Sequence, residues 1–149
     1  MTYSRFKRLA MAACFAVFAL ALTGCQTGEE YIAELAAQAA KGDVEANYKL
    51  AMIYFIGDNV DQNDKTGEVW MRKAAELGHP QAQNDMGLLY SKGMVVPLNL
   101  VQADKWFILS AAAGYKPAAT NQKKFEMTMT PKQIEQAQAL AKEWTSKQK

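Results

Sequence analysis

Residues 78–113 read GHPQAQNDMGLLYSKGMVVPLNLVQADKWFILSAAA, and the preceding residues 42–77 read GDVEANYKLAMIYFIGDNVDQNDKTGEVWMRKAAEL. When one stretch is laid on the other, identical residues recur in one register, among them Gly42 with Gly78, Ala46 with Ala82, Tyr54 with Tyr90, Gly57 with Gly93, Val60 with Val96, Trp70 with Trp106 and Ala75 with Ala111. A fixed period of about 20–50 residues is typical of proteins built from stacked repeats. The chain is therefore predicted to contain two consecutive repeats.

The recurring residues resemble the Sel-one-like repeat, a helix–turn–helix relative of the tetratricopeptide repeat. That family's unit runs A-x-x-L-G-x-x-Y-x-x-G-x-G-V, then D-x-x-x-A-x-x-W-x-x-K-A-A-x-x-G. The first copy fits it at Ala46, Leu50, Tyr54, Gly57, Val60, Trp70, Lys73, Ala74, Ala75 and Gly78. The second copy fits it at Ala82, Met86, Gly87, Tyr90, Gly93, Val96, Ala103, Trp106, Ala111 and Gly114. The departures are Ala51 at the helix glycine, Gly67 at the helix alanine, Met86 at the leucine, and Asn59 and Val95 at the second loop glycine.

The resemblance implies an all-α fold, a short right-handed α-solenoid of helix–turn–helix repeats with a capping helix at each end. The expected domain, 29–147, is divided into an N-terminal capping helix 29–41, repeats 42–77 and 78–113, a half repeat 114–127 and a C-terminal capping helix 131–147. Two repeats alone would be marginal because about three are needed to close a core. The half repeat and the two capping helices are expected to supply the missing cover.

Local signals place the helix ends. Asp43 is a suitable N-cap for a helix over 44–56, and Gly57 is a suitable stop. The second helix of that repeat is expected over 64–77, with Val69, Trp70, Ala74 and Leu77 inward. Pro80 is at the first position of the next helix, and Asn99 is at the start of the helix that follows it. Pro117 begins the first helix of the half repeat, so it starts a third first-type helix, meaning a helix that comes first in its repeat. Thr130-Pro131-Lys132-Gln133 reads as a capping box with proline at its first helical position.

Two features of the repeats concern packing. Because Trp70 and Trp106 recur at the repeat period, we expect them to be equivalent core residues rather than a stacking platform. Gly67 lies inside a predicted helix, where glycine costs about 1 kcal/mol relative to alanine. This glycine indicates either a close backbone approach or a weak point in the helix.

The N-terminus is typical of an exported lipoprotein. Arg5, Lys7 and Arg8 precede 14 uncharged residues, Leu9–Leu22, which is the length of a signal-peptide core and is short for a membrane span. Leu22-Thr23-Gly24-Cys25 resembles the bacterial lipobox, which implies a signal peptide 1–24, a lipidated Cys25 and a tether 25–28. The alternative is an ordinary signal peptide with an incidental cysteine. Since Gln26 rather than aspartate follows Cys25, the resemblance to sorted lipoproteins favours the periplasmic face of the outer membrane.

Removing residues 1–24 changes what the composition indicates. The chain has 17 basic and 15 acidic side chains, and three of the basic ones lie in the signal peptide, so the mature net charge is about −1. This charge argues against nucleic-acid binding. Cys14 leaves with the signal peptide and Cys25 carries lipid, so neither is available for a disulfide or a metal.

The mature sequence offers little for catalysis. His79 is its only histidine, and a lone histidine before a proline at a helix start is expected to be a solvated cap rather than a general base. Asp58, Asp61 and Asp64 have a superficial calcium-loop spacing, but they lack the glutamate that would complete the loop. We therefore expect no enzyme, no cofactor and no metal. A cell-wall or β-lactam hydrolase, proposed for cysteine-rich relatives, remains the remote alternative.

The resemblance therefore favours a lipid-anchored envelope scaffold or adaptor that binds another envelope protein or peptide. An immunity or inhibitor protein against a secreted effector is the alternative. In tetratricopeptide-like stacks the first helix of each repeat lines the concave side, and one face of these helices is free of packing duties. The predicted partner-binding residues on that face are Glu45, Tyr48, Met52, Phe55, Gln81, Asn84, Leu88, Ser91 and Lys124, with Thr120 in the same row. The competing expectation is that helix 29–41 or its tether covers Tyr48 and Phe55.

Overall fold

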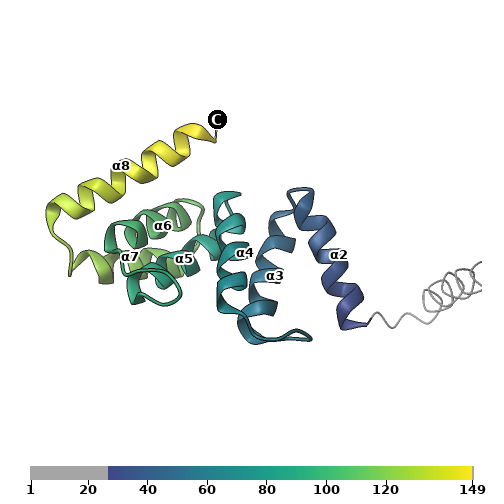
Figure 1. The fold of residues 1–149 in the computed structure, drawn as a ribbon. Helices are drawn as coiled ribbons and strands as arrows, with labels where there is room; N and C mark the ends of the chain where they lie inside the picture. Colours follow the sequence, from purple (N-terminus) through teal and green to yellow (C-terminus); the bar gives the residue numbers. More distant parts are fainter. Residues whose placement is uncertain (1–26, 149) are drawn as a thin grey trace, which may run out of the picture. The chain divides into compact units, whose positions relative to one another are not determined.

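The computed structural model describes residues 27–148, and in this part of the chain it contains seven helices and no strand. The helices are α2 (Gly28–Ala40), α3 (Val44–Ile56), α4 (Asp64–Glu76), α5 (Pro80–Lys92), α6 (Leu100–Ala112), α7 (Lys116–Glu126) and α8 (Pro131–Lys147) (Figure 1). The all-α prediction is confirmed. The predicted signal peptide and Cys25 lie outside the described residues.

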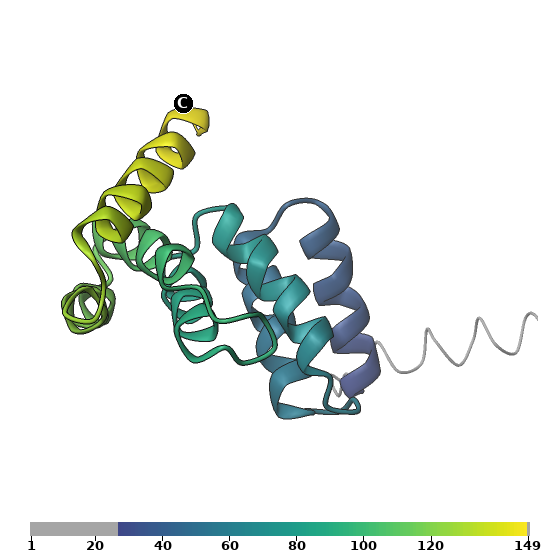
Figure 2. The same ribbon diagram turned by 60° about the vertical axis from the view of Figure 1, so that its left-hand side comes forward.

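Contacts divide the chain between Glu34 and Leu35, within α2. The part from Thr27 to Glu34 begins α2 with a capping box: the Thr27 hydroxyl accepts a hydrogen bond from the Glu30 amide, and the Glu30 carboxylate accepts one from the Thr27 amide. From Leu35 onward, consecutive helices pack together: α3 on α4, α4 on α5, and α5 on α6. Helix α6 also contacts α7 and α8 (Figures 1 and 2).

The helix ends follow from local chemistry, as predicted. The Asp43 carboxylate accepts a hydrogen bond from the Ala46 amide at 2.8 Å, and Asn63 and Asn99 cap α4 and α6 in the same way. Gly57 and Gly93 end α3 and α5 in the left-handed conformation, which glycine adopts without steric cost. The predicted capping box at Thr130 and Gln133 is present at the start of α8. Each cap pairs backbone groups that a helix end leaves open.

The second loop glycine of the family pattern is replaced at two positions that keep its backbone conformation. Asn59 has φ 58° and Val95 has φ 64°. Asparagine tolerates this left-handed region, whereas a β-branched residue is strained there. The loop of the second repeat therefore holds Val95 in an unfavourable conformation, and this valine is also exposed.

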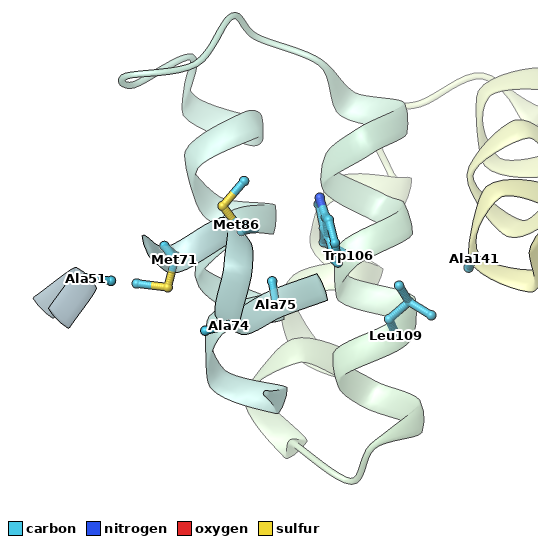
Figure 3. Close-up of a cluster of buried hydrophobic side chains, with 9 residues drawn as sticks. Ala51, Met71, Ala74, Ala75, Met86, Trp106, Leu109 and Ala141 are labelled. Atoms are coloured by element: carbon cyan, nitrogen blue, oxygen red, sulfur yellow. The ribbon is translucent and has the colours of Figure 1, made fainter. Parts of the chain in front are cut away.

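The central core of the larger unit is made of small residues and methionines. Met71 of α4 extends toward Ala51 of α3, and Met86 of α5 lies in the same cluster (Figure 3). Trp106 and Leu109 of α6 join them, and Ala141 contributes from α8. Alanine at the contact positions lets helix backbones approach closely, and the flexible methionines fill the remaining irregular space.

Two helical glycines, one in each repeat, make room for a phenylalanine ring. A Cβ added at Gly87 would lie 2.5 Å from the ring of Phe107, and one at Gly67 would lie 3.0 Å from the ring of Phe55. At Gly67 the close neighbour is a side chain, the ring of Phe55, rather than a backbone segment. Gly67 is on the second helix of its repeat and Phe55 is on the first. In the next repeat the order is reversed, with Gly87 on the first helix and Phe107 on the second.

Three predicted core positions differ from the structure. Val69 and Leu77 were expected inward, but each is 48% exposed. Trp70 is only half-buried, with the Lys73 ammonium 4.1 Å from its ring centre, whereas Trp106 is 2% exposed. The equivalence of the two tryptophans is wrong, because α6 is covered by α5, α7 and α8 while α4 packs on α3 and α5.

Candidate functional site

The first helices of successive repeats meet at a pocket of about 260 Å³. Its lining residues come from three helices, α3, α4 and α5, and they are Met52, Phe55, Met71, Asp85, Leu88 and Leu89. Five of these side chains are apolar, and Asp85 is the single charged one. The structure thus brings together three residues of the predicted row, Met52, Phe55 and Leu88, across a gap of 33 or more positions in the sequence.

A chain of hydrogen bonds borders this pocket. The Tyr48 hydroxyl donates to Oδ2 of Asp85 at 3.3 Å, and the Asn84 amide donates to Oδ1 of the same carboxylate at 3.1 Å. Asn121 on α7 in turn donates to Oδ1 of Asn84 at 2.9 Å. The chain therefore links α3, α5 and α7.

Burial changes the acid–base properties of this chain. Burial raises the pKa of the Asp85 carboxyl, while the hydrogen bonds from Asn84 and Tyr48 and the charge of nearby His79 lower it. The pKa of Tyr48 is raised to about 12, first by burial and then by the neighbouring Asp85 carboxylate. Tyr48 is therefore a hydrogen-bond donor at any physiological pH.

His79 is a cap, as predicted, but it is buried rather than solvated, being only 8% exposed. Its Nδ1 accepts a hydrogen bond from the Ala82 amide, so in this arrangement the ring proton is on Nε2, which lies 3.1 Å from the Glu45 carboxylate. The ring also stacks on Tyr48 with 4.4 Å between centroids. His79 thus joins the start of α5 to α3.

The other members of the predicted row lie in varied surroundings. Asn84 was expected on a free face, but it is 4% exposed and bonded to Asn121, so it is part of the packing between helices. Ser91 donates its hydroxyl hydrogen bond to the carbonyl of Leu88. Three remaining members are exposed, together with Thr120: Glu45, Gln81 and Lys124.

Sequence reasoning missed Asp85, Met71 and Leu89 as lining residues. Asp85 directly follows Asn84, a member of the predicted row, and an acidic residue at that position is expected to be an ordinary surface charge. Its burial arises because Tyr48, 37 positions earlier, lies against it. The repeat period was the available signal, since Asp85 and Asn121 are one period apart and both bond to the preceding first-type helix.

Within residues 27–148 no group of three or more His, Cys, Asp or Glu side chains is placed to hold a metal ion. In the same part of the chain, no helix combines the length and apolar character that crossing a membrane requires. The arrangement of the pocket is that of a small apolar recess with one acid, which suits binding.

Comparisons with known proteins agree on the architecture. The Sel1 repeat pattern matches residues 44–79 and 80–115. A solved Sel1 repeat protein from Oxalobacter formigenes is 33% identical with a TM-score of 0.62, and the match covers 74% of this chain and 82% of that protein. No curated protein sequence matches significantly.

A second solved structure is c5321, a protective antigen present in uropathogenic Escherichia coli strains and displaying an SLR fold. It is 28% identical with a TM-score of 0.73, and the match covers 86% of this chain. The chain spans only 28% of that protein's length. The likeness therefore concerns the fold and the repeats. From two repeat matches and a relative covered over most of its length, the chain belongs to the Sel1 repeat family.

Proposed function

We propose that this protein is a lipid-anchored adaptor of the cell envelope that binds another protein or peptide at the pocket between α3 and α5. Sel1-repeat folds are generally protein-interaction modules and are typically non-catalytic. The observation that carries the proposal is the pocket itself, because apolar side chains from two consecutive repeats converge there and remain accessible. Such recesses are typical of interaction sites.

The energetics of the pocket favour a side chain of the partner as its occupant. Filling it with one apolar side chain contributes about 1.5–3 kcal/mol. Met52 can adjust to the shape that enters, since an unbranched thioether side chain adapts more readily than a branched one. A modest pocket of this kind contributes one anchor to a wider contact, which the exposed Gln81 and Lys124 of the same row can extend.

The anchor is proposed from the N-terminal sequence alone. Three acyl chains on Cys25, as the lipobox resemblance implies, give firm attachment because one chain alone binds a membrane only marginally. We propose the periplasmic face of the outer membrane as the location. Cys25→Ser should leave unprocessed precursor or released protein, and membrane fractionation together with the mass of the N-terminal fragment measures this. Efficient recovery of the variant in the outer membrane would refute the anchor.

The binding role is tested by photocrosslinking in intact cells. A photoreactive amino acid at Leu88, in the lipidated full-length protein, should give discrete crosslinked products, whereas the same group at the exposed Glu135 of α8 should not. The Tyr48→Ala, Phe55→Ala double variant should lose those products. Its melting temperature should fall moderately because Tyr48 bonds to Asp85, but a cooperative unfolding transition should remain if the two residues act mainly in binding.

Two results would change the interpretation. A collapsed melting curve in the double variant would assign Tyr48 and Phe55 to the core and move the binding site elsewhere. Identification of the crosslinked partner as a secreted effector would favour the immunity role over a scaffold role. Equal crosslinking from Leu88 and Glu135 would contradict a specific site at the pocket.

A further inference from the structure

Asp85 is placed unusually for a carboxylate. It lies in the wall of an otherwise apolar pocket, and the groups that bond to it, the Tyr48 hydroxyl and the Asn84 amide, are both neutral. Within residues 27–148 no Lys or Arg side chain forms an ion pair with it. The groups bonded directly to Asp85 are therefore dipoles, and a charge on the nearby His79 acts on it only through space.

One neighbouring group, His79, can carry a compensating charge, and its charge lowers the pKa of Asp85. His79 makes no direct bond to Asp85, since its Nδ1 accepts a hydrogen bond from the Ala82 amide and its ring stacks on Tyr48. Its other nitrogen contacts the Glu45 carboxylate, which adds a second acid on this side of α3. The Lys49 ammonium lies 3.8 Å from the Glu45 carboxylate and forms an ion pair with it. Asp85 is therefore the single charged residue that lines the pocket, and no cationic side chain bonds to it directly.

A partially buried carboxylate without a directly bonded counter-ion is costly, and a cation brought by a partner lowers that cost. Burial raises the pKa of Asp85, which means that the surroundings disfavour the charged form of the carboxyl group. A pocket of about 260 Å³ is also below the range of roughly 300–1,000 Å³ that is typical of small-molecule sites. Its size suits a single long side chain.

The pocket walls match the two parts of a basic side chain. Lys and Arg lay their methylene stems along apolar surface and keep the charged group on polar partners. Met52, Phe55 and Leu88 provide the apolar surface, and the Asp85 carboxylate provides the acceptor at the same recess. Neither a purely apolar side chain nor an acidic one would use both features.

We propose that the pocket receives a Lys or Arg side chain of the partner, presented within an apolar segment, with Asp85 as the residue that selects the cation. This inference rests on the proposed binding function and names the chemistry of its ligand. The specificity is local to α3, α4 and α5 and does not require a charged surface elsewhere on the protein.

The test uses the full chain, solubilised in a mild detergent and immobilised, to select from a random-peptide library. Enriched peptides should carry Lys or Arg beside apolar residues, and replacing that residue with norleucine should weaken binding about tenfold or more. Asp85→Asn should weaken binding of the same peptides to a similar extent and abolish the preference for Lys over norleucine. The matched control is Glu135→Gln, which removes the same charge from an exposed position on α8 and should change neither.

The outcomes separate this inference from the proposed function. Enriched peptides that lack a cation, or a Lys preference that survives in Asp85→Asn, would overturn the inference while the adaptor role stands. No enrichment at all would count against both, and crosslinking from Leu88 would then decide the adaptor role by itself.

A second pair of variants covers the case in which Asp85→Asn unfolds. Met52→Lys supplies a lysine to the pocket from α3 and should abolish binding of cationic peptides. Met52→Gln changes the same side chain without charge and should retain most of that binding. Equal losses from the two would overturn the inference.

Discussion

The Tyr48 hydroxyl donates a hydrogen bond to the Asp85 carboxylate 37 positions later, and Asn84 accepts one from Asn121 at the same separation. Tyr48 and Asn84 are one repeat apart, as are Asp85 and Asn121. The same site on successive first-type helices therefore holds each helix to the next, although the residue types differ. This recurrence ties the stability of the stack to the edge of the candidate pocket.

Loss of the Tyr48 bond should cost measurable stability. Tyr48→Phe should lower the free energy of unfolding by about 1–2 kcal/mol, because it leaves a partly buried carboxylate with one donor fewer. Tyr54→Phe, which removes a half-buried hydroxyl from the same helix without breaking a bond between repeats, is the control. Chemical denaturation of the two variants measures the difference, and equal effects would contradict a role for the Tyr48–Asp85 bond.

The two tryptophans should respond unequally to truncation. Trp106→Ala should destabilise the protein by roughly 3–5 kcal/mol, since it empties a fully covered site between α5 and α8. Trp70→Ala should cost clearly less, because part of that ring already faces solvent beside Lys73. Thermal melts of both variants test this asymmetry, and a larger loss at Trp70 would contradict the arrangement of α7 and α8 over α6.

Relieving the backbone strain in the loop of the second repeat should stabilise the protein. A left-handed backbone costs about 1–2 kcal/mol for an ordinary residue, and glycine relieves it at some expense in unfolded-state entropy. Val95→Gly should therefore raise the free energy of unfolding by up to about 1 kcal/mol. Asn59→Gly should do less because asparagine tolerates that conformation. Denaturant midpoints compare the two, and destabilisation by Val95→Gly would mean that the exposed valine is held by contacts worth more than its strain.

Asp104 should make stability depend on pH. Its side chain is fully buried, neither carboxylate oxygen has a hydrogen-bond partner, and burial, followed by the proximity of Glu126, raises its pKa to about 7. The proton is bound more tightly in the folded state than in the unfolded state, where aspartate titrates near 3.9. The stabilisation is therefore complete below about pH 4 and is lost as the pH rises toward 7.

The measurement is the melting temperature between pH 4 and pH 8 for the wild type and for Asp104→Asn. As the pH rises, the melting temperature of Asp104→Asn should increase relative to that of the wild type, because asparagine cannot acquire the buried charge. The exposed Glu135→Gln serves as the control and should follow the wild type. A difference that stays constant over this range would contradict a buried, titrating Asp104.

Local signals in the sequence were sufficient for the elements of this fold. A cap such as Asp43 or Thr130 bonds to an amide only three residues away, and a stop such as Gly57 depends on its own backbone angle. The repeat period then made the order of helices predictable, and the family motif made the all-α stack predictable. These interactions join residues that are close together in the sequence, so they can be recognised from the sequence alone.

Only the tertiary structure decided which face of each helix is covered and how the pocket is assembled. Trp70 and Trp106 occupy the same position in their repeats, yet their burial differs because α7 and α8 follow the second repeat and no equivalent pair flanks α4 on that side. The place of Asp85 in the pocket depends on Tyr48, 37 positions away. Burial is a property of what packs around a residue, so identical positions in two repeats acquire different environments when different helices cover them.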